Sequence, residues 1–556
     1  MPAMHRSPPS APPILLVPLL LAALIAPCVA PAQSAPTTQS AQTILSPQST
    51  LPPDLDARVE AARAAFAVPG LCLAVVQDGK VLVARGYGSQ RLGEPAPVAA
   101  TTRFGIASNT KVFTATALLL LAEQGRLALD DRVQDHLPSF QLADPYVSRE
   151  LTVRDLLVHR SGLGLGAGDL LWWPGSALDR KTIVQRLRHV PLATSFRSTY
   201  AYDNVLYLAA GELLEATAGM PWEQFVQTRI LQPVGMDHTT VRYVDAERGG
   251  DVAGTHAEVD GKVVAVPPMR SDNTNPAGGI MSCAVDMAKW MDVLLHDGAL
   301  PRAGAANGDG KPAGDGRLLR ARSVRELETL VTPMPIPPRD EVLGELTPQF
   351  LGYALGLGVK DYRGHKVCTH TGGLPGYVSR VFLVPDQKLG VCVLTNMESL
   401  RAIDAIVYHV VDHALGHGGE RDWLATFQQA EQRARGKLAS EQQLANEQRD
   451  ATKGPSLALD RYARTYRDAW CGDVTVTCRD GQLEIAFADT PLLAGPLEHW
   501  QHDTFVARWT TRELRADAFV TFVLGPDGAV TEVRMAKASP DVDFSFDFEH
   551  LRLLPK

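Results

Sequence analysis

An α+β domain followed by a small all-β domain is the fold class that this sequence of 556 residues predicts. Two β-hairpin patterns stand near the two ends of residues 54–418, and helical patterns lie between them. A charged connector follows, and short alternating segments fill residues 457–556. Strands at both ends of a segment that also contains helices indicate one antiparallel sheet flanked by those helices.

Each of the two hairpin patterns of the first domain joins two β-rich runs through a short turn. Residues 70–88, GLCLAVVQDGKVLVARGYG, place Asp78-Gly79 between two β-rich runs. Asp-Gly between apolar runs is a strong sign of a two-residue turn. Residues 377–396, YVSRVFLVPDQKLGVCVLTN, repeat the pattern with a turn at 385–388. We therefore expect both segments to form antiparallel hairpins of the same sheet.

Helical spacing of apolar residues marks the remaining segments of this domain. Gly219 is a stop signal for one of them, because glycine readily adopts the left-handed conformation at a helix end. The predicted helices are at 54–66, after Ser108, at 204–219, at 284–298 and at 403–416.

Residues 457–556 alternate apolar and polar positions around further Asp-Gly turns, at Asp480-Gly481 and Asp527-Gly528. This pattern predicts a small β-sandwich or β-barrel. Residues 419–456 are charged and Gln-rich, which predicts a solvated helical linker between the two domains.

The N-terminal residues 1–32 have the layout of a secretory signal peptide. His5 and Arg6 precede a short apolar run, and small residues follow at Ala30 and Ala32. A retained membrane anchor is the alternative, but prolines interrupt the run before it reaches the ~20 residues that span a bilayer. We expect an exported protein, periplasmic or secreted, whose residues 33–53 form a disordered linker rich in Ser, Thr, Gln and Pro.

Composition excludes several classes of protein. A net charge of -8 without a basic stripe gives no support to a nucleic-acid partner. Six cysteines after the signal peptide, with no C-x-x-C pair, are too few for a disulfide scaffold and do not indicate a zinc site. Cys471 and Cys478 flank one short strand, and a disulfide between them is an open alternative to two free thiols.

Ser108 and Lys111, in the stretch SNTK, face the same side of an apolar helix start. One interpretation is a helix cap followed by an unrelated lysine. The other is a nucleophile beside its base, because a serine hydroxyl becomes reactive when a neighbouring group accepts its proton. A lysine can do so if burial lowers the pKa of its amine.

Two further segments carry polar groups suited to the same chemistry. Tyr202 and Asn204 precede a helix: a tyrosine can relay a proton, and an asparagine can bind substrate or steady the lysine. His370 and Thr371 run into glycines at a strand edge, where the Gly373 amide can join that of Ser108 in an oxyanion hole. Taken singly, each of these residues is more often structural.

In this order and separation, SNTK, YDN and HTG resemble the motifs of the penicillin-recognising serine hydrolases. The tyrosine of the second motif is similar to the branch with class C β-lactamases, serine DD-carboxypeptidases, D-aminopeptidases and related esterases. LLVHRSGL at 156–163 and NPAGGIMSCAVDMAKWM at 275–291 also look like this family. The resemblance covers residues 54–418 and implies an antiparallel sheet, flanking helices and a helical subdomain.

The resemblance implies a role for each motif residue. Ser108 would be the nucleophile that becomes acylated, Lys111 its pKa-shifted partner, and Tyr202 the general base and acid. Asn204 would bind the acyl side chain. His370, Thr371, Gly372 and Gly373 would form the substrate-binding and oxyanion-binding strand.

His370 stands where class C β-lactamases carry lysine. Histidine is mostly neutral at pH 7, so a fixed cation for a substrate carboxylate is missing. HTG resembles DD-carboxypeptidases and esterase-like members instead. We therefore expect an exported serine hydrolase of amides, peptides or esters, including peptidoglycan-derived or D-amino-acid-containing peptides. The appended β-domain resembles an accessory module whose role the sequence leaves open.

Three alternatives stay open at this point. The protein could be a weak β-lactamase, or a slowly acylating protein that binds cell-wall fragments or β-lactams. It could also use metal, since His409, His413 and His417 recur every four residues, but carboxylate ligands are not obvious and we favour surface histidines. The proposed chemistry requires no cofactor and no metal. Residues 162–168, GLGLGAG, do not fit G-x-G-x-x-G and predict a mobile loop beside the active site.

Overall fold

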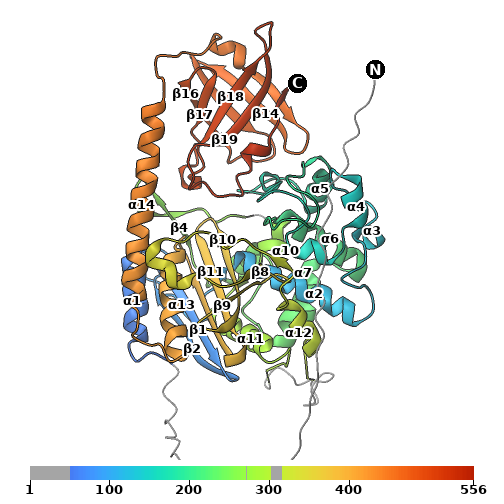
Figure 1. The fold of residues 1–556 in the computed structure, drawn as a ribbon, viewed down its shortest axis with the longest axis vertical. Helices are drawn as coiled ribbons and strands as arrows, with labels where there is room; N and C mark the ends of the chain where they lie inside the picture. The colour runs from blue at the N-terminus through green and yellow to red at the C-terminus, as the bar shows by residue number, and fades with distance from the viewer. Residues whose placement is uncertain (1–50, 271, 302–315) are drawn as a thin grey trace, which may run out of the picture. The chain divides into compact units, whose positions relative to one another are not determined.

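An eight-stranded antiparallel sheet forms the centre of the first domain (Figure 1). The computed structural model describes residues 51–270, 272–301 and 316–556; the predicted signal peptide and most of the linker after it lie outside this range. The strand order is β2-β1-β12-β11-β10-β9-β8-β7. These strands are β1 (Gly70–Gln77), β2 (Lys80–Gly88), β7 (Thr332–Pro333), β8 (Leu351–Tyr353), β9 (Gly358–Tyr362), β10 (His365–Leu374), β11 (Tyr377–Val384) and β12 (Leu389–Thr395).

The pairing of β1 with β12 confirms that the sheet is assembled from both ends of the domain. Leu71 lies opposite Thr395, and the pairing continues to Gln77 opposite Leu389. Both predicted hairpins are present, β1–β2 and β11–β12. Asp78 and Gly79 have φ of 49° and 75°, the two left-handed residues that a tight hairpin turn requires.

Strand β1 is buried on both faces, because helices cover both sides of the sheet. Leu71, Leu73 and Val75 belong to the core shared with α1 (Leu55–Ala65) and α13 (Leu400–Ala414). The alternate residues Cys72, Ala74 and Val76 belong to the core shared with α11 (Ala284–Leu295). A strand covered on both faces is a continuous apolar run, as the sequence has it.

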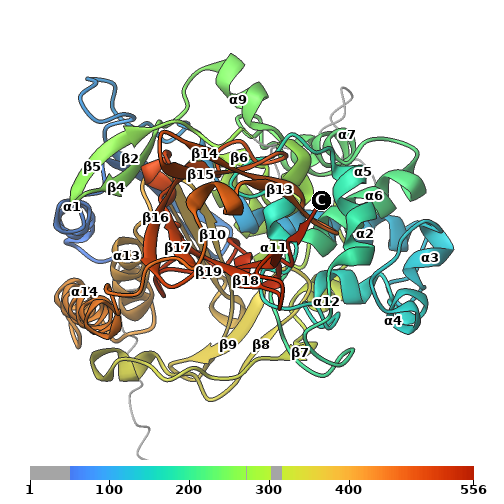
Figure 2. The ribbon, with the colours of Figure 1, turned by 90° about the horizontal axis from the view of Figure 1, so that it is seen from above.

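The helical subdomain lies beside the sheet and is centred on α2 (Lys111–Glu123) and α6 (Val205–Ala218), which pack together (Figures 1 and 2). Nearly every residue of α2 is buried, which explains its apolar sequence. Gly219 caps α6 with φ 72°, as predicted. The other helices of the first domain include α3 (Val133–His136), α4 (Pro145–Glu150), α5 (Arg180–Arg186), α7 (Trp222–Val226), α8 (Gln232–Val234), α9 (Tyr243–Gly249), α10 (Asn275–Gly278) and α12 (Ala321–Leu327).

The C-terminal domain is a nearly closed barrel rather than a sandwich. Its eight strands follow the order β19-β18-β17-β16-β15-β14-β13-β20, and a bridge between Val533 and Leu553 links the two ends of the sheet. The strands are β13 (Arg464–Asp468), β14 (Gly472–Arg479), β15 (Gln482–Phe487), β16 (Ala494–Gln501), β17 (Thr504–Ala507), β18 (Ala518–Leu524), β19 (Val530–Lys537) and β20 (Leu554–Pro555).

Helix α14 (Trp423–Gln448) connects the two domains. Its first turns bury Trp423 and Phe427 against α13, and most of its remaining residues are exposed. Two short hairpin strands, β4 (Thr255–Val259) and β5 (Lys262–Val266), and the pair β3 (Phe104–Gly105) and β6 (Met281–Ser282) complete the first domain. No helix in the described ranges is both long enough and apolar enough to cross a membrane.

Cys471 and Cys478 are free thiols. Cys478 lies within β14, and Cys471 directly precedes this strand. An extended chain rises about 3.3 Å per residue, so seven residues span roughly 23 Å. A disulfide requires Cα atoms within about 7 Å, so the strand itself keeps the two thiols apart.

We expect the contact between α2 and α11 to be a principal source of stability. The Phe113 and Trp290 rings stack with centroids 4.1 Å apart, and both side chains are fully buried. Phe113→Ala should lower the free energy of unfolding by about 3–5 kcal/mol, because it removes the ring and leaves a cavity. Denaturant titration measures this loss. Val81→Ala, at an exposed position of β2, is the control and should change stability by less than about 0.5 kcal/mol.

Candidate active site

Ser108 and Lys111 lie one above the other at the start of α2. Ser108 belongs to a 3₁₀ turn, Ala107–Thr110, and Lys111 is the first residue of the helix. Side chains three residues apart eclipse one another in such a turn, and the Lys111 Nζ lies 3.0 Å from the Ser108 Oγ. Ala107 has φ 48°, a left-handed conformation that costs a non-glycine residue about 1–2 kcal/mol. The turn therefore holds a hydroxyl directly against an amine.

The Lys111 amine is fully buried and has fixed partners. It donates to the Asn204 Oδ1 at 2.7 Å and to the Ala277 carbonyl oxygen at 3.1 Å. Burial lowers the pKa of Lys111 to about 7, although Asp169 and Asp203 act to raise it. A large fraction of this amine is therefore neutral near pH 7. A protonated amine donates to Ser108, Asn204 and Ala277, whereas a neutral amine that donates to Asn204 and Ala277 has its lone pair left for the Ser108 hydroxyl.

Tyr202 lies against the same amine, with its ring centroid 4.9 Å from the Lys111 Nζ. Burial raises the pKa of Tyr202 well above its ordinary value, and hydrogen bonding with Ser108 only partly opposes this. Near neutral pH the Tyr202 side chain is therefore a phenol. Of the two candidate bases for Ser108, only Lys111 has a pKa close to neutrality.

Asn204 occupies the N-cap position of α6 without capping the helix through its side chain. Its Oδ1 accepts from Lys111, and its Nδ2 donates to the Asp169 Oδ2 at 2.8 Å. Because a carboxylate only accepts and an amine here donates, the side-chain amide has one orientation. Asn204 thus steadies the lysine, one of the two roles that its position in the sequence indicates.

His370 is a neutral side chain with both ring nitrogens occupied. Its Nδ1 donates to the Thr371 carbonyl oxygen, so its Nε2 accepts from the Tyr353 hydroxyl at 2.7 Å. Burial, followed by the nearby charge of Lys111, lowers the pKa of His370 to about 3. This imidazole consequently offers no positive charge to a substrate.

The two glycines after Thr371 have different surroundings. A Cβ on Gly372 would overlap the carbonyl oxygen of Ile106, so this glycine allows β10 to pack on the turn that carries Ser108. Gly373 has no atom near the place of its missing Cβ, and it borders the pocket. Beyond Thr369, β10 pairs with β11 alone among the described strands, which leaves its other backbone edge open.

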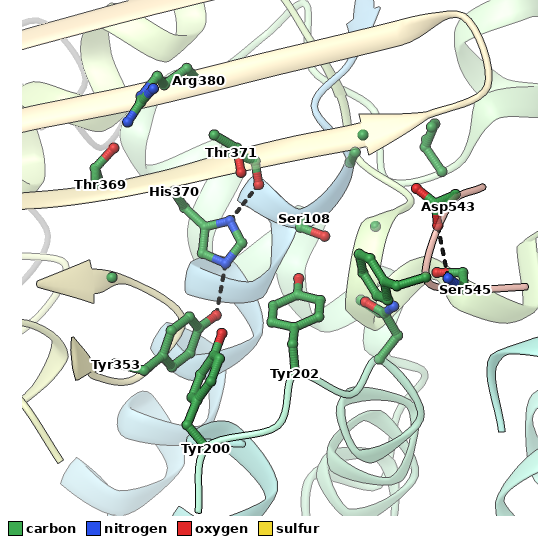
Figure 3. A pocket seen from close by; sticks show the side chains of 18 of the residues that line it. Ser108, Tyr200, Tyr202, Tyr353, Thr369, His370, Thr371, Arg380, Asp543 and Ser545 are labelled. Carbon is green, nitrogen blue, oxygen red and sulfur yellow. Dashed lines mark hydrogen bonds between the residues drawn. The ribbon is translucent and has the colours of Figure 1, made fainter. Parts of the chain in front are cut away.

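These groups surround one cavity of about 390 Å³ (Figure 3). Ser108, Tyr202, Asn204, His370, Thr371 and Gly373 all line it, whereas Gly372 and Lys111 lie behind its wall. Arg339, Lys360 and Arg380 also border the cavity, and Arg380 is paired with Asp404. The structure therefore brings the three sequence motifs together at one pocket.

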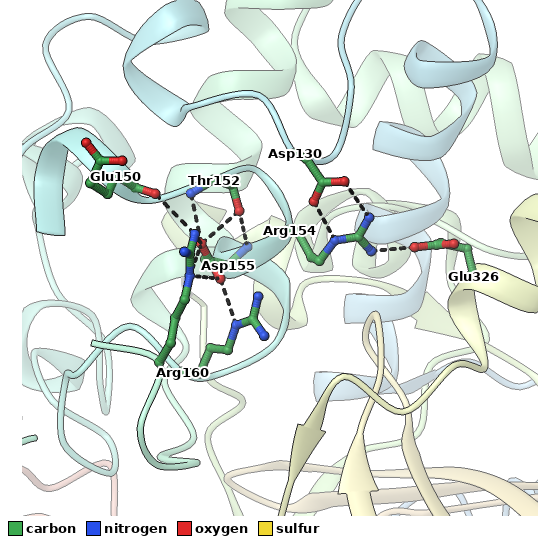
Figure 4. Close-up of polar contacts among 8 residues, drawn as sticks. Asp130, Glu150, Thr152, Arg154, Asp155, Arg160 and Glu326 are labelled. Atoms are coloured by element: carbon green, nitrogen blue, oxygen red, sulfur yellow. Dashed lines mark hydrogen bonds and ion pairs between the residues drawn. The ribbon is translucent and has the colours of Figure 1, made fainter. Parts of the chain in front are cut away.

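A buried carboxylate anchors the segments that support Tyr202 (Figure 4). Asp155 accepts from the Arg160 Nε at 2.7 Å and from the Arg197 Nη2 at 2.5 Å. Burial acts to raise the pKa of Asp155, but these hydrogen bonds hold it below its ordinary value. Arg160 follows His159, whose ring packs on Tyr202 with centroids 4.3 Å apart. Asp155 thereby links the segment of His159 and Arg160, which packs on Tyr202, to the segment of Arg197, which precedes Tyr202.

Several residues at this site were missed by the sequence analysis. His159 stands inside the stretch LLVHRSGL, and Asp169 directly follows GLGLGAG, so both adjoin segments that the sequence singles out. Tyr353 has no such signal. The GLGLGAG segment, predicted to be mobile, is buried except for Leu165, and its Gly166 donates to the Tyr202 carbonyl oxygen at 2.8 Å.

No group of three His, Cys, Asp or Glu side chains within 51–270, 272–301 and 316–556 is arranged to hold a metal ion. His409 pairs with Asp54, and His417 pairs with Glu420. His409 and His417 thus make ordinary polar contacts with neighbouring carboxylates.

Comparison with protein families agrees with this geometry. A family described as Beta-lactamase matches residues 55–414, and a domain of unknown function, DUF3471, matches residues 448–555. The chain belongs to the Beta-lactamase family. The resemblance drawn from the three motifs is therefore confirmed, and the first domain is a hydrolase domain of this family.

Known relatives of this Beta-lactamase-family chain cover it to different extents. Unguisins hydrolase ungD of Aspergillus violaceofuscus is 27% identical over 503 residues, covering 85% of this chain and 86% of the relative. Protein flp of Staphylococcus aureus (strain MW2) is 26% identical, covering 63% and 64%. The octameric penicillin-binding protein homologue from Pyrococcus abyssi has a TM-score of 0.56 and 21% identity, covering 90% of this chain and 99% of that chain. The likeness to this solved structure shows a shared fold.

The different surroundings of Gly372 and Gly373 lead to a paired prediction. Gly372→Ala should lower the melting temperature by several degrees, because its methyl group overlaps the Ile106 carbonyl and pushes β10 off the turn. Gly373→Ala should leave the melting temperature within about 1 °C, since its methyl group enters open space. Thermal unfolding followed by circular dichroism measures both; equal losses would contradict the packing role of Gly372.

Proposed function

We propose that this protein is a serine hydrolase that acts through a seryl acyl-enzyme on amide, peptide or ester substrates. The observation that carries the proposal is the buried Lys111 amine, with a pKa of about 7, placed 3.0 Å from the Ser108 hydroxyl. A hydroxyl beside a neutral amine is an activated nucleophile. Ser108 also lies at a cavity beside the open edge of β10, which leaves room for a substrate.

In the first step, the Ser108 Oγ attacks the substrate carbonyl carbon while its proton passes to the Lys111 Nζ. We assign this transfer to Lys111 rather than to Tyr202, because Tyr202 holds its own proton near neutral pH. The carbonyl oxygen becomes an oxyanion, which the backbone amides of Ser108 and Gly373 are proposed to bind.

In the second step, the tetrahedral intermediate collapses and the bond to the leaving group breaks. Tyr202 donates its phenolic proton to the leaving nitrogen or oxygen and regains a proton from Lys111. The acyl group stays on Ser108 as an ester. A water molecule then attacks this ester by the same proton path in reverse, which releases the acid and restores the serine.

The open edge of β10 suits an extended acyl chain, whose backbone can pair with residues 371–373 as an added strand. Short peptides and amides, including those with D-amino acids, fit this arrangement. The name of the relative unguisins hydrolase also favours hydrolysis over binding alone. Neutral His370 disfavours a substrate that relies on a cation at this position, so β-lactam hydrolysis is the weaker candidate.

Export to the periplasm or the medium is part of the proposal. It rests on the signal-like sequence of residues 1–32, which precedes the described residues.

Ser108→Ala tests the proposal most directly. The purified variant should lose at least about 1,000-fold in turnover of a short-chain p-nitrophenyl ester, because the oxyanion site alone gives only residual catalysis. Acid-quenched wild type should carry the acyl mass on Ser108, and the variant should carry none. Ser198→Ala, an exposed serine before Tyr202, is the matched control and should behave as wild type. Equal activity in wild type and Ser108→Ala would contradict the seryl mechanism. A wild type that acylates without turnover would favour the binding-protein alternative.

The proton path makes a prediction for Tyr202→Phe. Acylation by wild type should speed up as pH rises through about 7, because the base is the neutral Lys111 amine, and level off above. Tyr202→Phe should show the same rise of the acylation rate as pH passes through about 7. It should slow acylation by an amide about 100-fold or more, since an amine leaving group needs a proton. A p-nitrophenyl ester, whose phenolate leaves unprotonated, should lose less than about tenfold. Equal losses for both substrates would assign the deprotonation of Ser108 to Tyr202.

A further inference from the structure

A segment of the C-terminal domain reaches the catalytic pocket. After β19, the chain leaves the barrel, and Asp543, Phe544 and Ser545 line the cavity that contains Ser108 (Figure 3). The Phe544 ring stands edge-on to Tyr202, with centroids 5.7 Å apart. The domain of unknown function thus supplies part of the wall around the proposed nucleophile.

This contact is built into the hydrolase domain by glycines. Gly166 has φ 69°, and a Cβ there would meet the Phe544 carbonyl oxygen at 2.6 Å. The amide of Gly168 donates to the Asp547 Oδ2 at 2.7 Å. The GLGLGAG segment therefore lies between Tyr202 and the C-terminal domain, and its glycines allow the two backbones to approach.

A continuous chain of buried hydrogen bonds starts at Ser545. Its hydroxyl, only 3% exposed, donates to the Asp169 Oδ2 at 2.8 Å. The same oxygen accepts from the Asn204 Nδ2 at 2.8 Å, and the Trp172 indole binds the other carboxylate oxygen at 2.9 Å. Asn204 in turn accepts from the Lys111 amine. Two side chains, Asp169 and Asn204, thus join Ser545 to the proposed base through three hydrogen bonds.

We propose that Ser545 is a positioning residue of the active site: it orients Asp169, and through Asp169 and Asn204 it holds Lys111 in the geometry that accepts the Ser108 proton. This inference rests on the seryl mechanism proposed above. The C-terminal domain thereby takes part in catalysis, although Ser545 lies far along the chain from the three motifs.

The orientation of the Asn204 side-chain amide is set by its two hydrogen-bond partners. Asn204 presents its oxygen to Lys111 only while its nitrogen is held by the Asp169 carboxylate. Without the Ser545 donor, Asp169 keeps two partners instead of three and gains freedom to turn. Asn204 can then flip and direct an N–H toward Lys111, which misplaces the lone pair. Misplacement of a reacting group by 1 Å costs about 100-fold in rate.

Loss of Ser545 also changes the charge near Lys111. Burial raises the pKa of Asp169 to about 7, and hydrogen bonds from Asn204, Trp172 and Ser545 oppose this. Removing one donor raises the pKa of Asp169 further, and a neutral Asp169 no longer raises the pKa of Lys111. The rise of the acylation rate with increasing pH therefore occurs at a lower pH. The titratable groups that face this pair are Asp203, His159, His370, Tyr202, Tyr207 and Asp547.

The test is a double-mutant cycle on the full chain with Ser545→Ala and Asp169→Asn. The readout is the single-turnover acylation rate by a short-chain p-nitrophenyl ester. Ser545→Ala alone should reduce the maximal rate about 10- to 100-fold, keep the apparent substrate dissociation constant within about twofold, and move the rise of the acylation rate to lower pH. In the Asp169→Asn background, Ser545→Ala should change the rate less than about twofold, because its effect passes through Asp169.

Ser539→Ala is the matched control, since this hydroxyl lies on the same segment and contacts Asp541 and Gln442 away from the pocket. It should acylate as wild type. Should Ser545→Ala fail to fold, Ser545→Cys keeps the size with a weaker donor and should show an intermediate loss of rate.

Each outcome has a definite meaning. Two results would overturn the proposed route. One is that Ser545→Ala reduces the acylation rate in the Asp169→Asn background as much as it does alone. The other is that Ser545→Ala alone keeps the wild-type acylation rate. An inactive Ser108→Ala beside an unchanged Ser545→Ala rejects this inference alone. Retained activity in Ser108→Ala rejects the seryl mechanism and this inference with it.

Discussion

The burial of one amine governs the chemistry of this protein. Lys111 has an ordinary lysine side chain, and only its removal from water brings its pKa to about 7. The apolar helices α2 and α6 provide that dry environment, and Asn204 and the Ala277 carbonyl satisfy its N–H bonds. Burial of a charged group is costly. The fold tolerates it because the amine is neutral in much of the population and fully hydrogen-bonded.

The sheet and the helical subdomain must meet accurately for this amine to face a substrate. Gly372 lets β10 pack against the turn of Ser108, and Asp155 ties together the segments that support Tyr202. Ser108 and Lys111 at the start of α2 and Tyr202 before α6 are therefore held in place by contacts from several segments. Such preorganisation lowers the barrier because the groups need no rearrangement during the reaction.

Two features mark the pocket around Ser108. His370 is neutral and hydrogen-bonded at both nitrogens, so the positive charge expected for carboxylate recognition is missing there. The segment that follows β19 in the C-terminal domain lines the pocket with Asp543, Phe544 and Ser545. Residues of both domains therefore line the pocket.

The sequence alone determined the fold class and indicated most of the motif residues that the structure gathers at one pocket. Short turn sequences such as Asp78-Gly79 predicted the hairpins, apolar periodicity predicted α2 and α6, and the spacing of Ser108 and Lys111 placed them on one face, because these are local properties of the chain. Only the tertiary structure decided that the β-domain is a barrel and that burial raises the pKa of Tyr202. It alone joined Ser545 to Asp169, 376 positions away. Burial and long-range contacts depend on how distant segments pack, and no local pattern encodes that.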